Sequence, residues 1–99
     1  MRNTQHFNGL TEAQAERLTL LSEECAEVIQ VIAKIQRHGY ESFDPRKPDT
    51  INLGLLEKEI GHVLNAINMM YERCDIQACN VDIHTVAKHA SIPKWLHHQ

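Results

Sequence analysis

The stretch TEAQAERLTLLSEECAEVIQVIAKIQRHG, residues 11–39, contains the signals of one complete helix. Thr11 and Gln14 are spaced as a capping box, a pattern that predicts the start of a helix. No glycine or proline interrupts the stretch before Gly39, which follows the basic residue His38 as is typical of a helix end. We therefore expect a long helix that stops at His38-Gly39.

The residues that follow predict a connector and a second long helix. The connector runs from Tyr40 to about Asn52, and its helix-breaking residues are Asp44, Pro45, Pro48 and Asp49. A periodic segment extends from Leu53 to about Arg73, with Asn52 as its expected N-cap. We expect the two long helices to pack as an antiparallel pair.

The last part of the chain predicts a shorter helix and a tail. Asp82 is the expected cap of a helix that runs through about His89, and Pro93 introduces the tail, within residues 91–99. Residues 1–10 form a polar N-terminal segment. The 99 residues suffice for one small core and show no strand alternation, so we expect a single all-α domain over residues 1–99.

Composition and charge exclude several classes of protein. The hydrophobic fraction of 42% and the charged fraction of 23% are those of an ordinary globular chain. A net charge of -3 with scattered basic residues disfavours binding to a nucleic acid polymer. No apolar run approaches the roughly 18 residues of a membrane helix, and the polar start is unlike a signal peptide. We expect a soluble, cytoplasmic protein with no membrane partner.

The three cysteines are an odd number, and two of them fall on apolar helix faces, so we expect free thiols in a reducing compartment. Cys74, Cys79, His84 and His89 recur every five residues, which suggests zinc only weakly. On a helix, a step of five residues turns the side chain by roughly 140° and points successive ligands apart. We interpret these residues as core thiols and surface histidines instead.

Apolar residues fill about half of the circumference of each long helix, taking about 100° per residue. In the first helix they are Leu20, Leu21, Cys25, Val28, Ile29, Val31, Ile32 and Ile35, and in the second they are Leu56, Ile60, Val63, Leu64, Ile67, Met70 and Tyr71. Glu24 falls inside the first arc, with Glu27 at its edge and Glu23 just beyond. Glu59 falls inside the second arc, and His62 lies at its edge one turn along.

These buried-facing acids predict a metal site. A carboxylate in an apolar interface is costly unless it is paired or coordinates a cation. Neither apolar arc contains a Lys or Arg that could neutralise the acids. Oxygen ligands from facing helices commonly hold Mg²⁺ beside a phosphoryl substrate. The alternative is a solvated glutamate face, which is the usual role of glutamate on a helix.

Two short runs carry a resemblance to a known family. Glu23-Glu24-Cys25-Ala26-Glu27 and Glu59-Ile60-Gly61-His62 resemble the EExxE and ExxD motifs of the MazG-like all-α nucleoside triphosphate pyrophosphohydrolases. The first run matches completely, whereas the second has His62 in place of the family aspartate. The resemblance extends from about Leu10 to Lys94. It is strongest to short phage-encoded members, which have a similar stretch around residues 38–42 and a similar C-terminal end.

The resemblance implies an activity and a set of roles. It implies that a nucleoside or deoxynucleoside triphosphate is hydrolysed between its α and β phosphates, with Mg²⁺ or Mn²⁺ as cofactor. Glu24, Glu27 and Glu59 would be metal ligands. Glu23 would be a further ligand or the group that orients the attacking water, so Glu23 and Glu24 are the candidate catalytic acids. His62 would ligate the metal and shift preference toward Mn²⁺ or Co²⁺, drop out of the coordination shell, or mark a loss of activity.

The phosphates and the base of a nucleotide substrate would need contacts beyond the metal ligands. The cationic candidates are Lys88 on the third helix, Lys94 in the tail, and Lys34 and Arg37 near the end of the first helix. Asn65, with Asn68, could read a base edge from the second helix. For any single lysine, an ordinary surface role is the alternative, and nothing selects purine or pyrimidine.

The apolar arcs also predict self-association. Each arc spans roughly 180°, wider than the stripe of about 100° that one packed partner covers. We expect two hairpins to pair into a four-helix bundle as a homodimer, or to double into a tetramer, with the acids facing the interior. The leading function is a metal-dependent pyrophosphohydrolase that controls a nucleotide pool. The alternative is a non-catalytic helical module, a nucleotide sensor or dimerising regulator that kept the fold.

Overall fold

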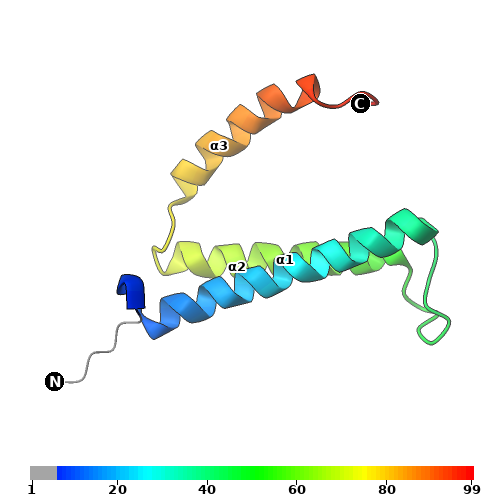
Figure 1. The fold of residues 1–99 in the computed structure, drawn as a ribbon, viewed down its shortest axis with the longest axis horizontal. Coiled ribbons are helices and arrows are strands. Elements are labelled where there is room, and N and C mark those ends of the chain that lie inside the picture. The colour runs from blue at the N-terminus through cyan, green and yellow to red at the C-terminus, as the bar shows by residue number, and fades with distance from the viewer. Residues whose placement is uncertain (1–6) are drawn as a thin grey trace. The chain divides into compact units, whose positions relative to one another are not determined.

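The computed structural model describes residues 7–99, and this part of the chain is all-helical, as expected. The elements in order are η1 (Phe7–Gly9), α1 (Glu12–His38), α2 (Asn52–Glu72), α3 (Ala78–Ser91) and η2 (Ile92–Lys94), with η denoting a 3₁₀ helix (Figure 1). The chain divides into two compact units, the first ending at Met69 and the second starting at Met70. The single domain expected over residues 1–99 stays a prediction. Most of the expected N-terminal segment, residues 1–6, lies outside the described residues.

Both ends of α1 follow the sequence prediction. The Thr11 hydroxyl accepts a hydrogen bond from the Gln14 amide at 3.1 Å, and the Thr11 amide donates to the Gln14 side chain at 2.9 Å. At the other end the Gly39 amide donates to the Ile35 carbonyl at 2.7 Å. Gly39 has φ 87° and ψ 169°, a backbone region that is essentially restricted to glycine. The glycine therefore lets the chain leave the helix without strain.

The connector between α1 and α2 is held by backbone contacts. Phe43 and Ile51 form an isolated antiparallel bridge. The Asn52 amide donates to the Ser42 carbonyl at 2.8 Å, and the next amide, of Leu53, donates to the carbonyl of Tyr40 at 3.0 Å. These contacts close the connector into a defined loop.

The start of α2 differs from the sequence prediction. Asn52 is the first residue of the helix, not its N-cap, because the Leu55 amide donates to the Ile51 carbonyl at 3.1 Å. The Asn52 side chain is buried and donates instead to the Gly39 carbonyl at 3.2 Å. The asparagine therefore joins the end of α1 to the start of α2. This long-range contact is invisible in a local capping pattern.

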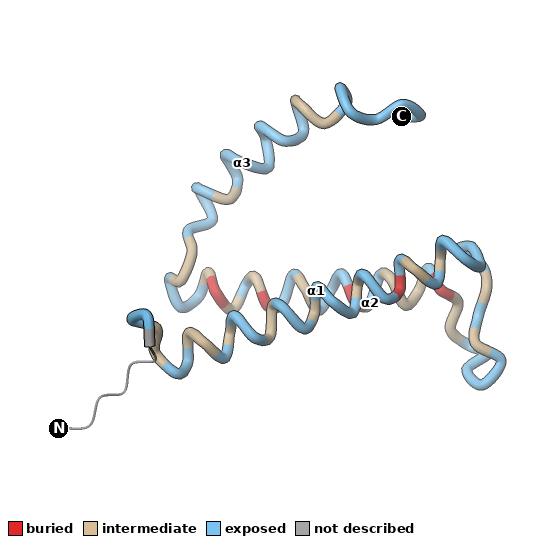
Figure 2. The backbone as a smooth tube through the Cα atoms, viewed as in Figure 1, coloured by how far each residue is buried: buried red, intermediate tan, exposed pale blue. Residues whose placement is uncertain are grey.

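The first unit is an antiparallel helical hairpin, confirming the expected pairing of the two long helices. Asn52, at the start of α2, contacts Gly39 at the end of α1, and His62 in the middle of α2 contacts Glu24 in the middle of α1. The contacts thus run in opposite chain directions, and the ribbons of the two helices run alongside each other (Figure 1). Val31 and Ala66 are buried between them, while most of the hairpin stays half-buried or exposed (Figure 2).

In the second unit, α3 starts four residues before the expected cap. Asp82 lies inside the helix, and Gln77 occupies the cap position, its carbonyl accepting from the amides of Asn80 and Val81 at 3.1 and 3.2 Å. The reason lies in the turn that ends α2, where Cys74 has a positive φ of 60°. That early turn leaves room for α3 to begin at residue 78. The helix has no buried residue of its own.

The cysteines are free, as expected, but they are not core thiols. Cys25, Cys74 and Cys79 are all exposed. Cys25 does lie on the apolar arc of α1, but on a part of the arc that α2 does not cover. The sequence pattern indicates the face of the helix correctly and its burial wrongly.

Candidate metal centre

Four side chains of the hairpin converge midway along it. Each of Glu24, Glu27, Glu59 and His62 offers one ligand atom, and these atoms all lie within 4.8 Å of one another. We call this group the acidic cluster. It contains the four residues that the sequence predicts as metal ligands. Among the described residues, it is the group of side chains that could hold a metal ion.

The convergence follows from helix geometry. Glu24 and Glu27 on α1 are three residues apart, as are Glu59 and His62 on α2, and residues at this spacing are neighbours on one face of a helix. The antiparallel pairing of α1 and α2 then sets one pair opposite the other. Two motifs separated by more than thirty residues in the chain therefore form one site.

Two carboxylates of the cluster have oxygens without a hydrogen-bond partner. Glu59 is buried, and the side chain of Glu24 is only 15% exposed. The Oε2 atom of each is fully buried and has no hydrogen-bond partner. An unsatisfied buried acceptor costs about 1–3 kcal/mol, and more when it is charged. These two oxygens are thus suited to a cation.

His62 lies against both oxygens. Its Nδ1 atom is 3.2 Å from Glu24 Oε2 and 3.3 Å from Glu59 Oε2, while about half of its side chain is exposed. A single N–H cannot point at two acceptors, and neither oxygen gains a hydrogen bond of good geometry from the ring. The histidine contacts the acids but leaves both incompletely satisfied.

A lysine from outside the apolar arcs also reaches the cluster. Lys58 Nζ lies 3.6 Å from Glu59 Oε1. Lys58 precedes Glu59 and lies outside the apolar arc, so the arc pattern did not reveal it. Its long, flexible side chain extends to the acid from the exposed surface, where 57% of the side chain stays accessible. The contact engages Oε1 and leaves the Oε2 atom unsatisfied.

The acids on the two helices influence each other's ionisation. The pKa of Glu27 is raised above its usual value, first by a hydrogen bond with Glu59 and then by the negative charges of Glu24 and Glu59. The same hydrogen bond lowers the pKa of Glu59, against the effect of burial. Glu27 therefore holds a proton more readily than Glu59 does. A cation bound beside both acids would favour the ionised form of each.

The chemistry of the donor set fits a divalent metal ion. Three carboxylates supply the hard oxygen ligands that Mg²⁺ and Mn²⁺ prefer, and the imidazole adds a ligand typical of transition metals. The two orphaned oxygens of Glu24 and Glu59 belong to this set. Glu27 and His62 are exposed, so the cluster is open to solvent on one side. The cluster can therefore hold a metal ion and leave room for a ligand.

Glu23 and Asn65 lie beside the cluster but outside it. Glu23 is exposed and lines a separate hollow with Leu20 and Met69. Asn65 is exposed one turn beyond His62, and its Nδ2 atom lies 3.7 Å from the sulfur of Met69. Asn68 is exposed as well. Their predicted roles toward water and base stay predictions.

The predicted cationic contacts are dispersed. Lys34 is exposed ten residues after Glu24 on α1, a rise of about 15 Å along the helix. It lines a hollow at the connector with Arg37. Lys88 lies on α3 and Lys94 on η2, both in the second unit. Within the first unit, Lys34 and Arg37 lie outside the acidic cluster, and the substrate roles of all four cations stay predictions.

The weak zinc pattern does not form a site in the described part of the chain. Cys74, Cys79, His84 and His89 are exposed and form no group of potential ligands. The histidines are surface residues, as interpreted. None of the described helices combines the length and apolar character needed to cross a membrane.

Comparisons with known proteins identify no relative of this chain. The chain matches no family model, no curated protein and no solved structure.

Proposed function

We propose that this protein is a metal-dependent hydrolase that splits a nucleoside or deoxynucleoside triphosphate into a monophosphate and pyrophosphate. The observation that carries the proposal is the acidic cluster, with two buried carboxylate oxygens that lack a hydrogen-bond partner. The motif resemblance of residues 23–27 and 59–62 supplies the reaction class. Mg²⁺ or Mn²⁺ is the proposed cofactor, with Co²⁺ as a further candidate because of His62.

Each residue has a defined part in this proposal. Glu24, Glu27 and Glu59 would hold the metal with carboxylate oxygens, and His62 would add a ring nitrogen. The metal, when bound, neutralises phosphate oxygens and makes the α-phosphorus open to attack. Glu23 is exposed one residue before Glu24, where its carboxylate can orient the attacking water and accept its proton. A bound metal would compete with protonation of Glu27, whose pKa is raised.

We also propose that the protein self-associates through the hairpin. The residues Cys25, Val28, Ile29, Ile60, Val63 and Leu64 line an apolar hollow on α1 and α2, which we call the apolar flank. Ile29 is 67% exposed and Leu64 is 55% exposed. A second copy of the hairpin would cover this surface and complete a four-helix bundle, as a homodimer or within a tetramer.

A substrate panel tests the proposed reaction. The purified protein is incubated with each common ribonucleoside and deoxynucleoside triphosphate, with Mg²⁺ and with Mn²⁺ in parallel, and release of pyrophosphate is measured. We expect pyrophosphate from at least one substrate, and its loss when Glu24→Gln removes a ligand charge. The matched control is Glu57→Gln, which removes the same charge from an exposed site on α2.

Two outcomes would contradict the reaction. If the Glu24→Gln variant still released pyrophosphate, the acidic cluster would have no part in the reaction. Metal binding without pyrophosphate release from any substrate would favour the alternative function, a nucleotide-sensing or dimerising module that kept the fold. The position that favours this alternative is His62, where the family motif has an aspartate.

A further inference from the structure

A group of positively charged residues lies at the end of the hairpin where the connector joins α1 to α2. Lys34, Arg37 and Arg46 line a hollow of about 370 Å³ there, together with one acid, Asp44, and with Ser42 and Phe43. We call it the basic hollow. Its volume is at the lower end of the range of about 300–1,000 Å³ for small-molecule sites.

The two cations on α1 have no acidic partner. Lys34 and Arg37 are three residues apart, so they lie on the same face of the last turns of the helix. Neither forms an ion pair with any residue that the structure describes. The chain has 13 acidic residues against 10 basic ones, so two unpaired cations on one face stand out. They create local positive charge in a negatively charged protein.

The third cation, Arg46, is held in place by Asp44. The guanidinium donates to both carboxylate oxygens of Asp44, at 3.2 Å from Nε and 2.9 Å from a terminal nitrogen. These bonds lower the pKa of Asp44 to about 2, so the pair stays ionised at neutral pH. They use two of the five N–H donors of an arginine. The remaining donors are oriented by the pair and stay available.

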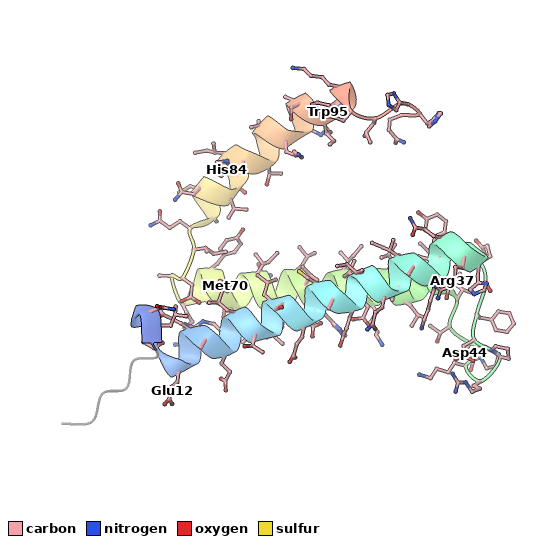
Figure 3. All side chains as sticks on the ribbon, in the orientation of Figure 1. Glu12, Arg37, Asp44, Met70, His84 and Trp95 are labelled. Carbon is pink, nitrogen blue, oxygen red and sulfur yellow. The ribbon has the colours of Figure 1, made fainter. Side chains whose placement is uncertain are left out.

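The chain around the hollow is also fixed. The bridge between Phe43 and Ile51 and the bond from the Asn52 amide to the Ser42 carbonyl hold the connector against the start of α2. A ligand would therefore pay little conformational entropy to order this loop. Figure 3 shows Arg37 and Asp44 at this same end of the hairpin.

The helix dipole accounts for only part of the arrangement. Cations in the last turn of a helix are common because they interact favourably with its negative end, and Arg37 fits this explanation. Lys34 lies a turn earlier, and Arg46 is not on a helix. The hollow has three cations against one acid, Asp44, which is paired with Arg46, so positive charge is in excess there. Such an excess suits an anion with several negative oxygens, since guanidinium groups match phosphate geometry.

We propose that the basic hollow binds the diphosphate or triphosphate group of a small phosphorylated molecule. The site is separate from the acidic cluster, because Lys34 follows Glu27 by seven residues, a rise of about 10 Å along α1. Its charge is opposite to that of the cluster, so binding there needs no metal ion. The inference goes beyond the proposed reaction and does not depend on it.

Nuclear magnetic resonance with pyrophosphate as the probe tests the site in the absence of divalent metal. Backbone amide shifts of the full chain are followed as pyrophosphate is added in the presence of EDTA, with chloride at matched ionic strength as reference. We expect saturable changes confined to residues 34–52. The double variant Arg37→Gln, Arg46→Gln should weaken binding by about tenfold or more, equivalent to about 1.4 kcal/mol.

Two control variants make the result decisive. Lys47→Gln removes a neighbouring charge that does not line the hollow, and it should change the affinity by less than about twofold. Glu24→Gln should keep pyrophosphate binding even though it disrupts the metal site, so failure of the proposed reaction is distinguishable. The proposal is wrong if no saturable shift occurs, if shifts spread over α3 equally, or if Lys47→Gln weakens binding as much as the double variant.

Discussion

The hairpin has two flanks at the same level along its length that differ in an unusual way. One flank buries an acidic side chain, and the other exposes an aliphatic one. On one flank, Glu59 is a carboxylic acid with only 8% of its surface exposed. On the other, Leu64 is an aliphatic residue with 55% exposed. Buried polar groups and exposed apolar surfaces are the informative exceptions in a folded protein. Here the same two helices show both.

The difference teaches that the two flanks suit partners of different kinds. One step along α2, from Glu59 to Ile60, turns the side chain by about 100° and moves from the acidic cluster to the apolar flank. The acids need positive charge, whereas the aliphatic residues need apolar surface. A metal ion and a second copy of the chain are the partners we propose.

The largest expected effect is on the acidic side. Glu59→Gln keeps the shape of the side chain but removes its charge, so Mn²⁺ affinity and pyrophosphate release should each fall at least about tenfold, or about 1.4 kcal/mol. Without metal the variant should still fold, because glutamine keeps the size of the side chain, but with a somewhat lower melting temperature, because the folded state favours the ionised form of Glu59. Calorimetric titration, the pyrophosphate assay and thermal melting measure the three quantities.

Glu57→Gln serves as the control for this prediction, since Glu57 lies two residues away on α2 and is exposed. It should leave all three quantities nearly unchanged. Retention of turnover and metal affinity within about threefold in Glu59→Gln would mean that the cluster does not bind the metal.

The next effect is on the apolar side. Ile29→Glu places a charge in the centre of the apolar flank, so the variant should sediment as an 11.4 kDa monomer while the original chain sediments as a dimer or larger. Gln30→Glu adds the same charge at the neighbouring exposed position and should not change the mass. If the original chain is itself a monomer at micromolar concentration, the proposed self-association through the apolar flank is wrong. Metal binding by Ile29→Glu should persist if the two flanks are independent.

Lowering the pH should weaken metal binding at the acidic cluster and leave the apolar flank unaffected. The pKa of Glu27 is raised, so Glu27 keeps its proton to higher pH than an ordinary glutamate. Metal binding needs the deprotonated form, so the affinity should decline as pH falls through this raised pKa, by up to about tenfold per pH unit for one displaced proton. Calorimetric titration with Mn²⁺ across this range measures the slope. Glu27→Gln should flatten it, and an unchanged slope in that variant would exclude Glu27 as the proton carrier.

The smallest effect concerns the histidine. His62→Asp introduces the aspartate of the motif that residues 59–62 resemble. The ratio of activity with Mg²⁺ to activity with Mn²⁺ or Co²⁺ should then rise several-fold, because Mg²⁺ prefers oxygen ligands. Parallel assays with the three metals measure this ratio. An unchanged ratio would place His62 outside the coordination shell and leave the metal to the glutamates.

Local signals in the sequence were enough to predict the bounds of α1 and the four residues of the acidic cluster. The capping pair of Thr11 and Gln14 and the glycine at 39 act within a few residues, so they define the helix without tertiary contacts. Helical periodicity then sets the direction of Glu24 and Glu59 relative to their apolar neighbours. Both predictions depend on geometry that repeats along one helix.

The features that sequence reasoning missed depend on other parts of the chain. Lys58 reaches Glu59 through a flexible side chain, which no helical wheel represents. The basic hollow needs the reversal of the connector, which brings Arg46 near residues at the end of α1. The start of α3 depends on the turn at Cys74, so Asp82 was a plausible but wrong cap.

The buried asparagine at the start of α2 sets the alignment of the metal ligands from a distance. Asn52 and Glu59 are seven residues apart, nearly two helical turns, so they share one face of α2. The bond from Asn52 to the Gly39 carbonyl therefore fixes both the rotation and the axial register of α2 against α1. A slip of one residue would move Glu59 by about 1.5 Å and turn it by about 100°. Insertions in the connector should therefore be tolerated only if they leave the Asn52 side chain in place. The geometry of the acidic cluster thus depends on a contact nearly two helical turns away from Glu59.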